Sequence, residues 1–532
     1  MGSFFFWARR IKNGRGAEWP LLALLLALSG WWYRDSIFLY PSFNHAWAQA
    51  DWLAIALNFR ARGYDFFHPA TFNLLTDQGV TGAGFPLPAY VAALLMGLAR
   101  TEDPGLMRGL TLAASLSGLL ALFGLVRRAS GSAWKGATVV LFAFCSPIYV
   151  FYQANFLPTV PALAAALAGY YWFYWALAES ADPRHTRRRL AAAVAWLALA
   201  AAIRAPFALP LLCTLGHIVV LRPRRTAAST GWPAVGIIYG AAFLFLITVL
   251  LYNEQLSRAH HGSMFLMRPR AFASWAQAVE ATQTVREYWL WKVLSKPQWL
   301  LLVLAAGAVG AGPGRGLLRG EWVGHWLALV VGGVAYYGLM GQQFAIHDYY
   351  LLDAFFLPLV LGFGACVVVL RPAPARHLRV VVGAVALLLT GLAAWQARAE
   401  QQRRICPPAT DNSVRTRDNF LASARWLDSL GVPRSATILV LDAYSYNLPL
   451  LLARRRGWTM LRNQNSPQDL SAENLQRALR LPADYVITQN ATYRASVVAA
   501  YPAIGAHLRP VADNGRLTLW QIRKPSAAPG GP

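Results

Sequence analysis

Long apolar runs separated by short basic loops are the feature that most constrains how this chain can fold. A membrane-spanning helix needs about 20 consecutive, mostly apolar residues. Runs of about this length recur from residue 19 to residue 396. Only 14% of the 532 residues are charged, whereas soluble domains carry about a quarter. The sequence therefore predicts an all-α polytopic membrane protein with an added soluble part. The roughly eleven predicted spans are 19–39, 106–126, 134–152, 158–178, 190–203, 205–221, 232–252, 298–312, 322–341, 350–370 and 379–396.

The basic residues predict the orientation of these spans. We expect segment 83–100, with Pro86 and Pro88 near its start, to remain at the membrane surface or dip into it. Every basic cluster then falls on the side of the N-terminus, which the positive-inside rule makes cytoplasmic, and the C-terminus lies outside. Because the clusters occupy short loops, the net charge of +25 indicates membrane orientation and not a nucleic-acid partner. The clusters comprise Arg127, Arg128, Lys135, Arg184, Arg187–Arg189, Arg222, Arg224, Arg225, Arg315, Arg319, Arg371, Arg376 and Arg379.

This topology gathers acidic and histidine residues on the outer face. The outer segments are loop 40–105, segment 253–297, segment 341–350 and everything after about residue 397. We infer an outward-facing site built from several loops. Its candidate polar residues include His45, Asp51, Asp65, His68, Arg268, Arg270, His347 and Asp348.

From about residue 397 the composition changes to that of a soluble domain. A helix is predicted over 414–430, and strands alternate with helices beyond it, which predicts an α/β domain over 397–524. Asp442 ends a strand, where α/β sites often lie, although a turn carboxylate is the alternative role. Residues 525–532 are predicted to form a disordered tail. The four cysteines show neither zinc spacing nor an evident disulfide pair. The expected strands are 436–442, 458–461, 484–488 and 517–522, and the further helices are 448–456 and 470–480.

The first outer loop opens with the motif His45-x-Trp47-x-Gln49-x-Asp51. In a helix, His45 and Gln49 form one i, i+4 pair, and Trp47 and Asp51 form a second. Asp51 is the candidate general base, and its alternative role is to cap or salt-bridge an interfacial helix.

The order of several motifs resembles the polytopic glycosyltransferases of the GT-C fold, in particular the bacterial branch similar to protein mannosyltransferases and aminoarabinose transferases (family 39-like). The resemblance covers roughly residues 19–396. Two departures concern carboxylates: Gly84 stands where relatives usually have an acid, and the second outer turn offers Asn155 and Thr159 instead of one. The matching motifs are the one ending at Asp51, Asn58–Phe59, Asp65 to Pro69, Gly84-Phe85-Pro86-Leu87 leading to Tyr90, and His347-Asp348-Tyr349-Tyr350.

The resemblance implies inverting transfer of a sugar from a polyprenyl-phosphate donor to a lipid, glycan or protein acceptor, on the periplasmic face of the bacterial inner membrane. Asp51 matches the carboxylate that acts on the acceptor. Inverting transfer needs such a base, and cationic groups to hold the departing phosphate. No cofactor is predicted, and the use of a metal stays open. The candidate substrate-binding residues are His45, Trp47, Gln49, Asp65, His68, Arg204, Arg268, Arg270, His347, Asp348 and Tyr349.

Two other functions compete with this hypothesis. A transporter or flippase of lipid-linked intermediates typically has ionisable groups near mid-bilayer and matched halves with broken helices, whereas here only Arg204 interrupts a run. A non-catalytic scaffold would use the C-terminal domain for binding and leave the first-loop motif unexplained. Two candidates also have structural alternatives: Arg204 as a span boundary, and His347 with Asp348 as a span-end anchor.

Overall fold

The computed structural model describes residues 16–178, 182–221, 230–265, 269–311, 320–370, 375–406, 411–462 and 469–523. The chain forms two compact units. The helical unit comprises Met1–Ile37, Met107–Tyr252 and Leu266–Arg403. The mixed unit comprises Phe38–Leu106, Asn253–Phe265 and Arg404–Pro532. The predicted site residue Arg268 lies outside the described residues, as do Arg222, Arg224, Arg225, Arg315, Arg319 and Arg371 of the basic clusters.

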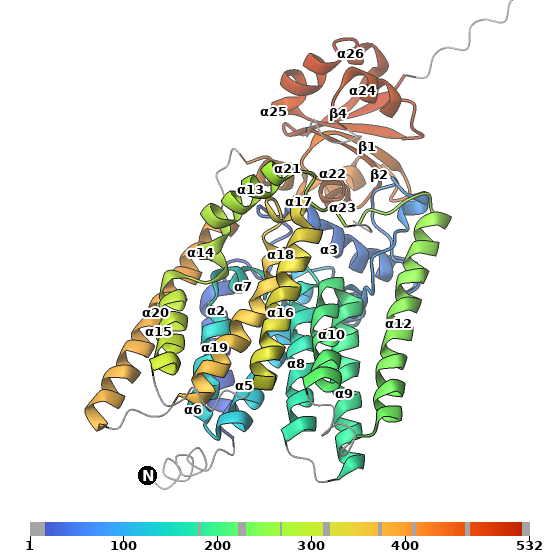
Figure 1. The fold of residues 1–532 in the computed structure, drawn as a ribbon. Helices are drawn as coiled ribbons and strands as arrows, with labels where there is room; N and C mark the ends of the chain where they lie inside the picture. Colours follow the sequence, from blue (N-terminus) through green and yellow to red (C-terminus); the bar gives the residue numbers. More distant parts are fainter. Residues whose placement is uncertain are drawn as a thin grey trace, which may run out of the picture. The chain divides into compact units, whose positions relative to one another are not determined.

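The helical unit is a bundle in which consecutive and distant helices pack along their lengths (Figure 1). α8 packs against α9, α10 against α9 and α16, and α19 against α6, α15 and α16. The bounds are α2 Glu18–Tyr33, α5 Pro104–Ser130, α6 Ala133–Phe144, α7 Pro147–Tyr152, α8 Thr159–Ala178, α9 Pro183–Ile203, η2 Ala205–Phe207, α10 Ala208–Gly216, η3 His217–Leu221, α12 Trp232–Ala259, α13 Trp275–Thr284, η4 Val285–Trp289, α14 Leu290–Val293, α15 Lys296–Ala311, α16 Gly320–Leu339, α17 Gly341–Phe344, α18 Tyr349–Leu351, η6 Leu352–Phe356, α19 Leu357–Val369 and α20 Arg376–Ile405.

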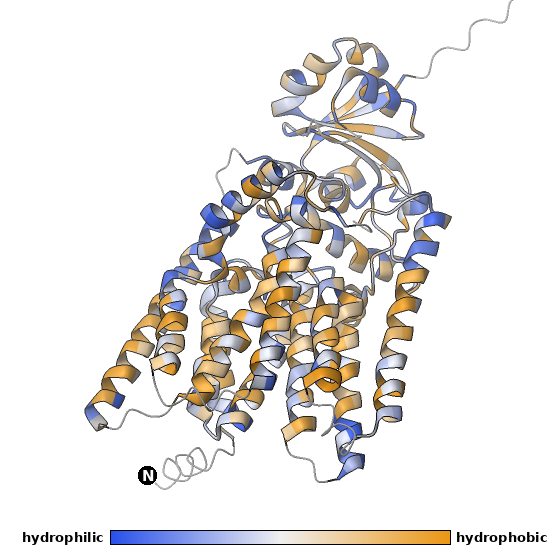
Figure 2. Ribbon diagram, viewed as in Figure 1, coloured by the Kyte–Doolittle hydropathy of each residue, from blue (hydrophilic) through white to orange (hydrophobic). Residues whose placement is uncertain are grey.

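Several of these helices are suited to crossing a membrane, and Figure 2 shows them hydrophobic over most of their length. In the described part of the chain, five are long and apolar enough: Pro104–Ser130, Trp232–Ala259, Gly320–Leu339, Tyr349–Val369 and His377–Ile405. Trp275–Val293 and Lys296–Ala311, bent by 83°, make up to a sixth. The chain is therefore an integral membrane protein, and the larger count of about eleven spans stays a prediction.

The interruption predicted at Arg204 is present. α9 ends at Ile203, and Arg204 is extended (φ −148°, ψ 107°) before the short turn η2. Pro206 lies two residues after Arg204, and a proline disfavours a continuous helix through the residues before it. Arg204 is thus displayed at a helix break.

The mixed unit contains a five-stranded sheet of order β2-β1-β3-β5-β4. β1 pairs in parallel with β2 and β3, while β5 pairs antiparallel with β3 and β4. The strands are β1 Thr437–Ala443, β2 Arg456–Leu461, β3 Tyr485–Gln489, β4 Leu508–Asp513 and β5 Leu517–Ile522. The other elements are α3 Ala46–Ala61, η1 Asp77–Gly79, α4 Leu87–Leu98, α21 Asn412–Phe420, α22 Ser423–Ser429, α23 Leu448–Ala453, α24 Ala472–Ala478, α25 Asn490–Thr492, η7 Tyr493–Val498 and α26 Ile504–His507.

All four predicted strands are confirmed. The clearest signal was the continuous apolar run of β1, which is buried on both faces. β1 is buried at six of its seven positions. The edge strand β4 was missed, since most of its residues are exposed and no such run marks it. The helix predicted over 414–430 is wrong as a single element: it is divided into α21 and α22 between Phe420 and Ser423.

The first outer loop joins this sheet through β2. Leu74 N donates to Gly457 O at 2.8 Å, and Gly457 N donates to Phe72 O at 3.1 Å. A Cβ on Gly457 would lie 1.7 Å from the backbone oxygen of Ile438, so only glycine fits between the loop and β1. Trp458 Nε1 adds a hydrogen bond to Leu74 O at 3.1 Å.

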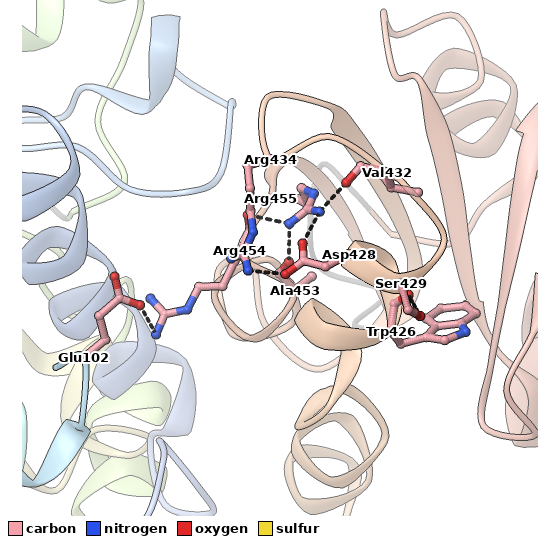
Figure 3. Close-up of polar contacts among 9 residues, drawn as sticks. All are labelled: Glu102, Trp426, Asp428, Ser429, Val432, Arg434, Ala453, Arg454 and Arg455. Carbon is pink, nitrogen blue, oxygen red and sulfur yellow. Dashed lines mark hydrogen bonds and ion pairs between the residues drawn. The ribbon is translucent and has the colours of Figure 1, made fainter.

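Arginines fix the C-terminal end of α23 (Figure 3). The fully buried Arg455 donates to Asp428 Oδ1 at 2.8 Å and to Val432 O at 2.6 Å. Its neighbour Arg454 pairs with Glu102 of the first outer loop at 2.8 Å. Both contacts lie within the mixed unit, and together they fix α23 against α22 and against the loop.

Candidate functional site

The predicted base Asp51 lies in the second turn of α3 and is 5% exposed. Asn447 Nδ2, at the N-terminus of α23, donates to Asp51 Oδ1 at 2.7 Å. Among the described residues, this is the hydrogen bond that the Asp51 carboxyl accepts. The partner is an amide and not a cation. The hydrogen bond therefore stabilises the negative charge of an ionised Asp51 without neutralising it.

This environment shifts the pKa of Asp51 toward neutral pH. Burial raises the pKa of Asp51 to about 7, and the hydrogen bond from Asn447 opposes that rise. A carboxyl with a pKa near the working pH is both available as a base and strong enough to accept a proton. The alternative in which Asp51 caps the helix does not fit, because the N-terminal position belongs to His45.

The other members of the motif shape the start of α3. His45 has a left-handed backbone (φ 54°) at the helix start, and its ring meets Trp47 edge-on at 6.2 Å between centroids. Gln49 Nε2 donates to Ser42 O at 3.2 Å and to Asn44 O at 2.6 Å. The predicted i, i+4 pair of His45 and Gln49 is joined through the backbone: Gln49 N donates to His45 O at 3.0 Å. Gln49 therefore fixes the preceding loop, and within the described residues its side chain forms no hydrogen bond with Asp51.

Asp65 and His68 form a pair of their own. His68 Nδ1 lies 2.7 Å from Asp65 Oδ2, and both side chains are 50% exposed. Phe67 N donates to the other Asp65 oxygen at 3.0 Å. Within the described residues, no ion pair or hydrogen bond connects them to Asp51.

Gly84 is the position at which the family resemblance led us to expect an acid. It is tied to Asn253 by two hydrogen bonds of 2.9 Å, one from Gly84 N to Asn253 Oδ1 and one from Asn253 Nδ2 to Gly84 O. An amide thus holds this turn through its backbone.

Two half-buried arginines of the mixed unit were not predicted. Burial and the neighbouring guanidinium of Arg456 together lower the pKa of Arg62 to about 10. Arg456 Nη2 also lies 3.5 Å from Asn58 Oδ1, on α3. Neither arginine forms an ion pair with a described carboxylate, so this surface favours an anion.

In the helical unit the structure brings Arg204 and Tyr349 together. Arg204 lies 5.2 Å from the ring centroids of both Tyr349 and Tyr350, in cation–π geometry. Its Nε and Nη2 donate to Asp353 Oδ2 at 2.9 and 2.6 Å, and the Asp353 side chain is fully buried. A paired, partly exposed guanidinium inside an apolar bundle is typical of a functional position.

Arg204 also lines a cavity of about 550 Å³, a volume in the range of ligand pockets. Of the described residues that line it, Arg204 carries the only charge, beside Tyr336 and Tyr350. Pro269 lines the same cavity, and the next residue, Arg270, is exposed. Gln342 N donates to Arg270 O at 3.2 Å, which ties this loop to the start of α17.

His347 and Asp348 precede α18 and are both buried. His347 Nδ1 lies 2.9 Å from Gln343 O, and its ring contacts those of Tyr349 and Tyr350 at 5.4 Å. Tyr152 of α7 donates to Asp348 Oδ1 at 2.6 Å. This polar pair is thus built into the bundle and not displayed as a free span end.

No three His, Cys, Asp or Glu side chains of the described residues group as metal ligands would. His261 Nδ1 pairs with Asp77 Oδ2 at 2.7 Å, and both are exposed. Metal chemistry therefore cannot be derived from the residues that the structure describes.

Asn447 and Asp353, the hydrogen-bond partners of Asp51 and Arg204, are contacts that the sequence did not reveal. Asp353 carried a usable signal, since an acid inside an apolar run marks a membrane site. Asn447 carried none: it lies 396 residues from Asp51, and only the tertiary fold brings the two together.

Apolar helices of span length with an attached α/β sheet define the class of this chain, a polytopic membrane protein of the GT-C fold. No protein-family model matches it, and no curated protein matches it in sequence. Solved structures match it in three-dimensional fold. The aminoarabinose transferase ArnT from Cupriavidus metallidurans is similar at TM-scores of 0.58 in the apo state and 0.62 bound to undecaprenyl phosphate. The identity is 13%, over 94% of this chain and 97% of ArnT.

The Archaeoglobus fulgidus oligosaccharyltransferase in complex with Zn and sulfate is also similar, at a TM-score of 0.57 and 10% identity, over 94% of this chain and 73% of that one. The predicted GT-C fold is thus confirmed, and at these identities the likeness concerns the fold.

Proposed function

We propose that this protein is a membrane glycosyltransferase that moves a sugar from a polyprenyl-phosphate donor to a cell-envelope acceptor. The observation that carries the proposal is the buried Asp51 carboxyl, whose pKa burial raises to about 7, in a chain with the fold of ArnT. One ArnT structure holds undecaprenyl phosphate, and a structure of the archaeal oligosaccharyltransferase AglB holds an inhibitory peptide and a dolichol-phosphate. A lipid-linked donor is therefore the expected substrate class.

Asp51 would act as the general base of an inverting transfer. The acceptor hydroxyl loses its proton to the Asp51 carboxylate as its oxygen attacks the anomeric carbon. The new C–O bond forms on the face opposite the phosphate. The old anomeric C–O bond breaks, and its electrons leave with the polyprenyl phosphate. The configuration inverts, and the proton on Asp51 later passes to solvent.

Arg204 would bind the donor phosphate in the helical unit. Arginine is suited to phosphate because its planar guanidinium donates several hydrogen bonds and stays charged. The otherwise uncharged cavity beside it suits the first isoprene units of the lipid. Asp353 would position the guanidinium through its two hydrogen bonds.

The remaining predicted residues keep supporting roles in this proposal. Trp47 offers an indole face to a sugar ring, and His45 and Gln49 shape the start of α3. Asp65 with His68, Arg268 with Arg270, and His347, Asp348 and Tyr349 stay candidates for substrate contacts. We also retain about eleven spans, a cytoplasmic N-terminus and an outer C-terminal domain in a bacterial inner membrane.

The test is sugar transfer by the purified full-length protein in proteoliposomes. Undecaprenyl-phosphate monosaccharides serve as donors, and released undecaprenyl phosphate is measured with a panel of lipid, glycan and peptide acceptors. We expect Asp51→Asn to lower turnover by at least about 10²-fold, the scale of a lost general base. Asp77→Asn, which removes an exposed carboxylate of the same loop, should keep most of it. Wild-type turnover in Asp51→Asn would refute the base. Translocation of the donor without any glycosyl product would point instead to a flippase.

A further inference from the structure

Asn447 connects three segments of the mixed unit through one fully buried side chain. Its Nδ2 donates to Asp51 Oδ1 at 2.7 Å, and its Oδ1 accepts from Asn73 N at 3.0 Å. Asp51 belongs to α3, Asn73 to the first outer loop and Asn447 to the α/β domain. The domain thus supplies the hydrogen-bond donor to the proposed base.

The orientation of this amide is fixed by chemistry. A backbone N–H can only donate, so the Asn447 atom that faces Asn73 must be the oxygen. The NH₂ group is then directed at Asp51. Because the NH₂ group donates and cannot accept, the contact favours the ionised carboxylate over the protonated one.

The neighbourhood of Asn447 is held from several directions. Asn73 Nδ2 and Thr459 Oγ1 both donate to Tyr446 O, at 3.1 and 3.0 Å. Leu448 N donates to Ser445 Oγ at 3.0 Å. At the other end of α23, the buried Arg455 and the Arg454–Glu102 pair anchor the helix (Figure 3). A side chain held this firmly can position its partner.

We propose that Asn447 is a positioning residue for Asp51, so that the C-terminal α/β domain is a working part of the transferase and not only an appended binding module. The role rests on the proposed function in that Asp51 is taken as the base. Asn447 touches neither the acceptor nor the donor in this scheme. It holds one carboxylate oxygen and stabilises the charge that the base needs before it accepts a proton.

The contact has a direct effect on the pH dependence. Burial raises the pKa of Asp51, and the Asn447 hydrogen bond limits that rise. Without the bond, a smaller fraction of Asp51 is ionised at neutral pH. The transfer rate should then require a higher pH to reach its plateau, while the binding of the donor is unaffected.

The experiment compares wild type with Asn447→Ala, Asn447→Asp and Glu102→Gln in the full-length protein. Glu102→Gln is the matched control. It breaks the ion pair with Arg454 at the other end of α23 and the longer one with Arg60 at the end of α3, and it does not touch Asp51. Two readouts are taken: the pH profile of undecaprenyl phosphate release, and the infrared carbonyl band of a protonated carboxyl that Asp51→Asn lacks, titrated with pH. The infrared readout does not depend on turnover.

We expect Asn447→Ala to move the acid limb of kcat and the infrared midpoint upward by about one pH unit, the scale of a hydrogen bond to a charged group, with KM for the donor unchanged. Asn447→Asp should move both further, because two adjacent carboxyls disfavour a second charge. Glu102→Gln should leave both in place. The double variant Asp51→Asn with Asn447→Asp exchanges the two side chains. It should be more thermally stable than either single variant, but it should not transfer sugar.

Two failures are distinguishable. If Asp51→Asn is inactive but Asn447→Ala keeps the wild-type acid limb and infrared midpoint, the positioning role is wrong and the proposed function stands. If Asp51→Asn transfers sugar at the wild-type rate, Asp51 is not the base, and the positioning role of Asn447 is refuted with it. A shift in Glu102→Gln equal to that in Asn447→Ala would mean that α23 acts only as a general support, which also overturns the proposal.

Discussion

Replacing the Arg204–Asp353 pair separates a structural role of Arg204 from its proposed contact with the donor phosphate. Asp353→Ala removes both hydrogen bonds that hold the guanidinium, at 2.9 and 2.6 Å, and leaves a cation that is only 23% exposed. Breaking a buried pair by removing one partner costs about 3–5 kcal/mol. Because Arg204 keeps some exposure and two tyrosine rings, we expect about 3 kcal/mol, the lower end of that range.

Replacing both partners should behave differently. Well-packed apolar residues in place of a buried ion pair are often neutral or stabilising, so Arg204→Met with Asp353→Leu should recover most of the lost stability. The same variant lacks the guanidinium. Undecaprenyl phosphate at one hundred times its Kd should stabilise the wild type by about 2.7 kcal/mol and leave the double variant unchanged.

The assay is thermal unfolding in detergent with increasing undecaprenyl phosphate, with undecaprenol as the ligand that lacks the phosphate. Arg189→Met is the matched control, because Arg189 also lies over an aromatic ring, 4.1 Å from Trp175, but does not line the cavity. The reasoning about Arg204 is refuted if the double variant gains as much from undecaprenyl phosphate as wild type does. A fully stable Asp353→Ala would refute the structural part alone.

Two further predictions test the mixed unit. The folded-state pKa of Asp51 is raised to about 7, so its protonated form contributes stability that is fully present below pH about 4 and lost as pH rises through about 7. Relative to Asp51→Asn, wild type should lose about 4 kcal/mol across that window, measured by chemical unfolding; parallel curves would contradict this. Gly457→Ala should destabilise by about 3 kcal/mol or more, because its Cβ would lie 1.7 Å from Ile438 O; an unchanged Tm would show that the strands can separate there.

The sequence predicted the parts of the fold that depend on local pattern. Apolar runs and the positions of prolines and Arg204 predicted where helices form and where one breaks. Buried runs predicted four of the five strands. The edge strand β4 was not predictable in this way, because its side chains mostly face solvent and its pairing with β5 is decided by the rest of the sheet.

The candidate site was predictable residue by residue but not contact by contact. The motif marked Asp51, and the break marked Arg204. Neither pattern could show their partners, because Asn447 follows Asp51 by 396 residues and Asp353 follows Arg204 by 149. Asp65 and His68 are the opposite case. Both were candidate site residues, and the structure shows that they pair with each other over a spacing of three residues.

An amide partner allows a single buried carboxylate to act as a base near neutral pH. A guanidinium in the place of Asn447 would lower the pKa of Asp51 well below neutral and weaken it as a base. An apolar residue there would leave burial unopposed and keep the carboxyl protonated. An asparagine donates one hydrogen bond without neutralising the charge, which holds Asp51 between these limits. With Gly84 in place of an acid, the proposed base has no need of a second carboxylate to bring its pKa to neutrality, because burial raises it and Asn447 limits the rise.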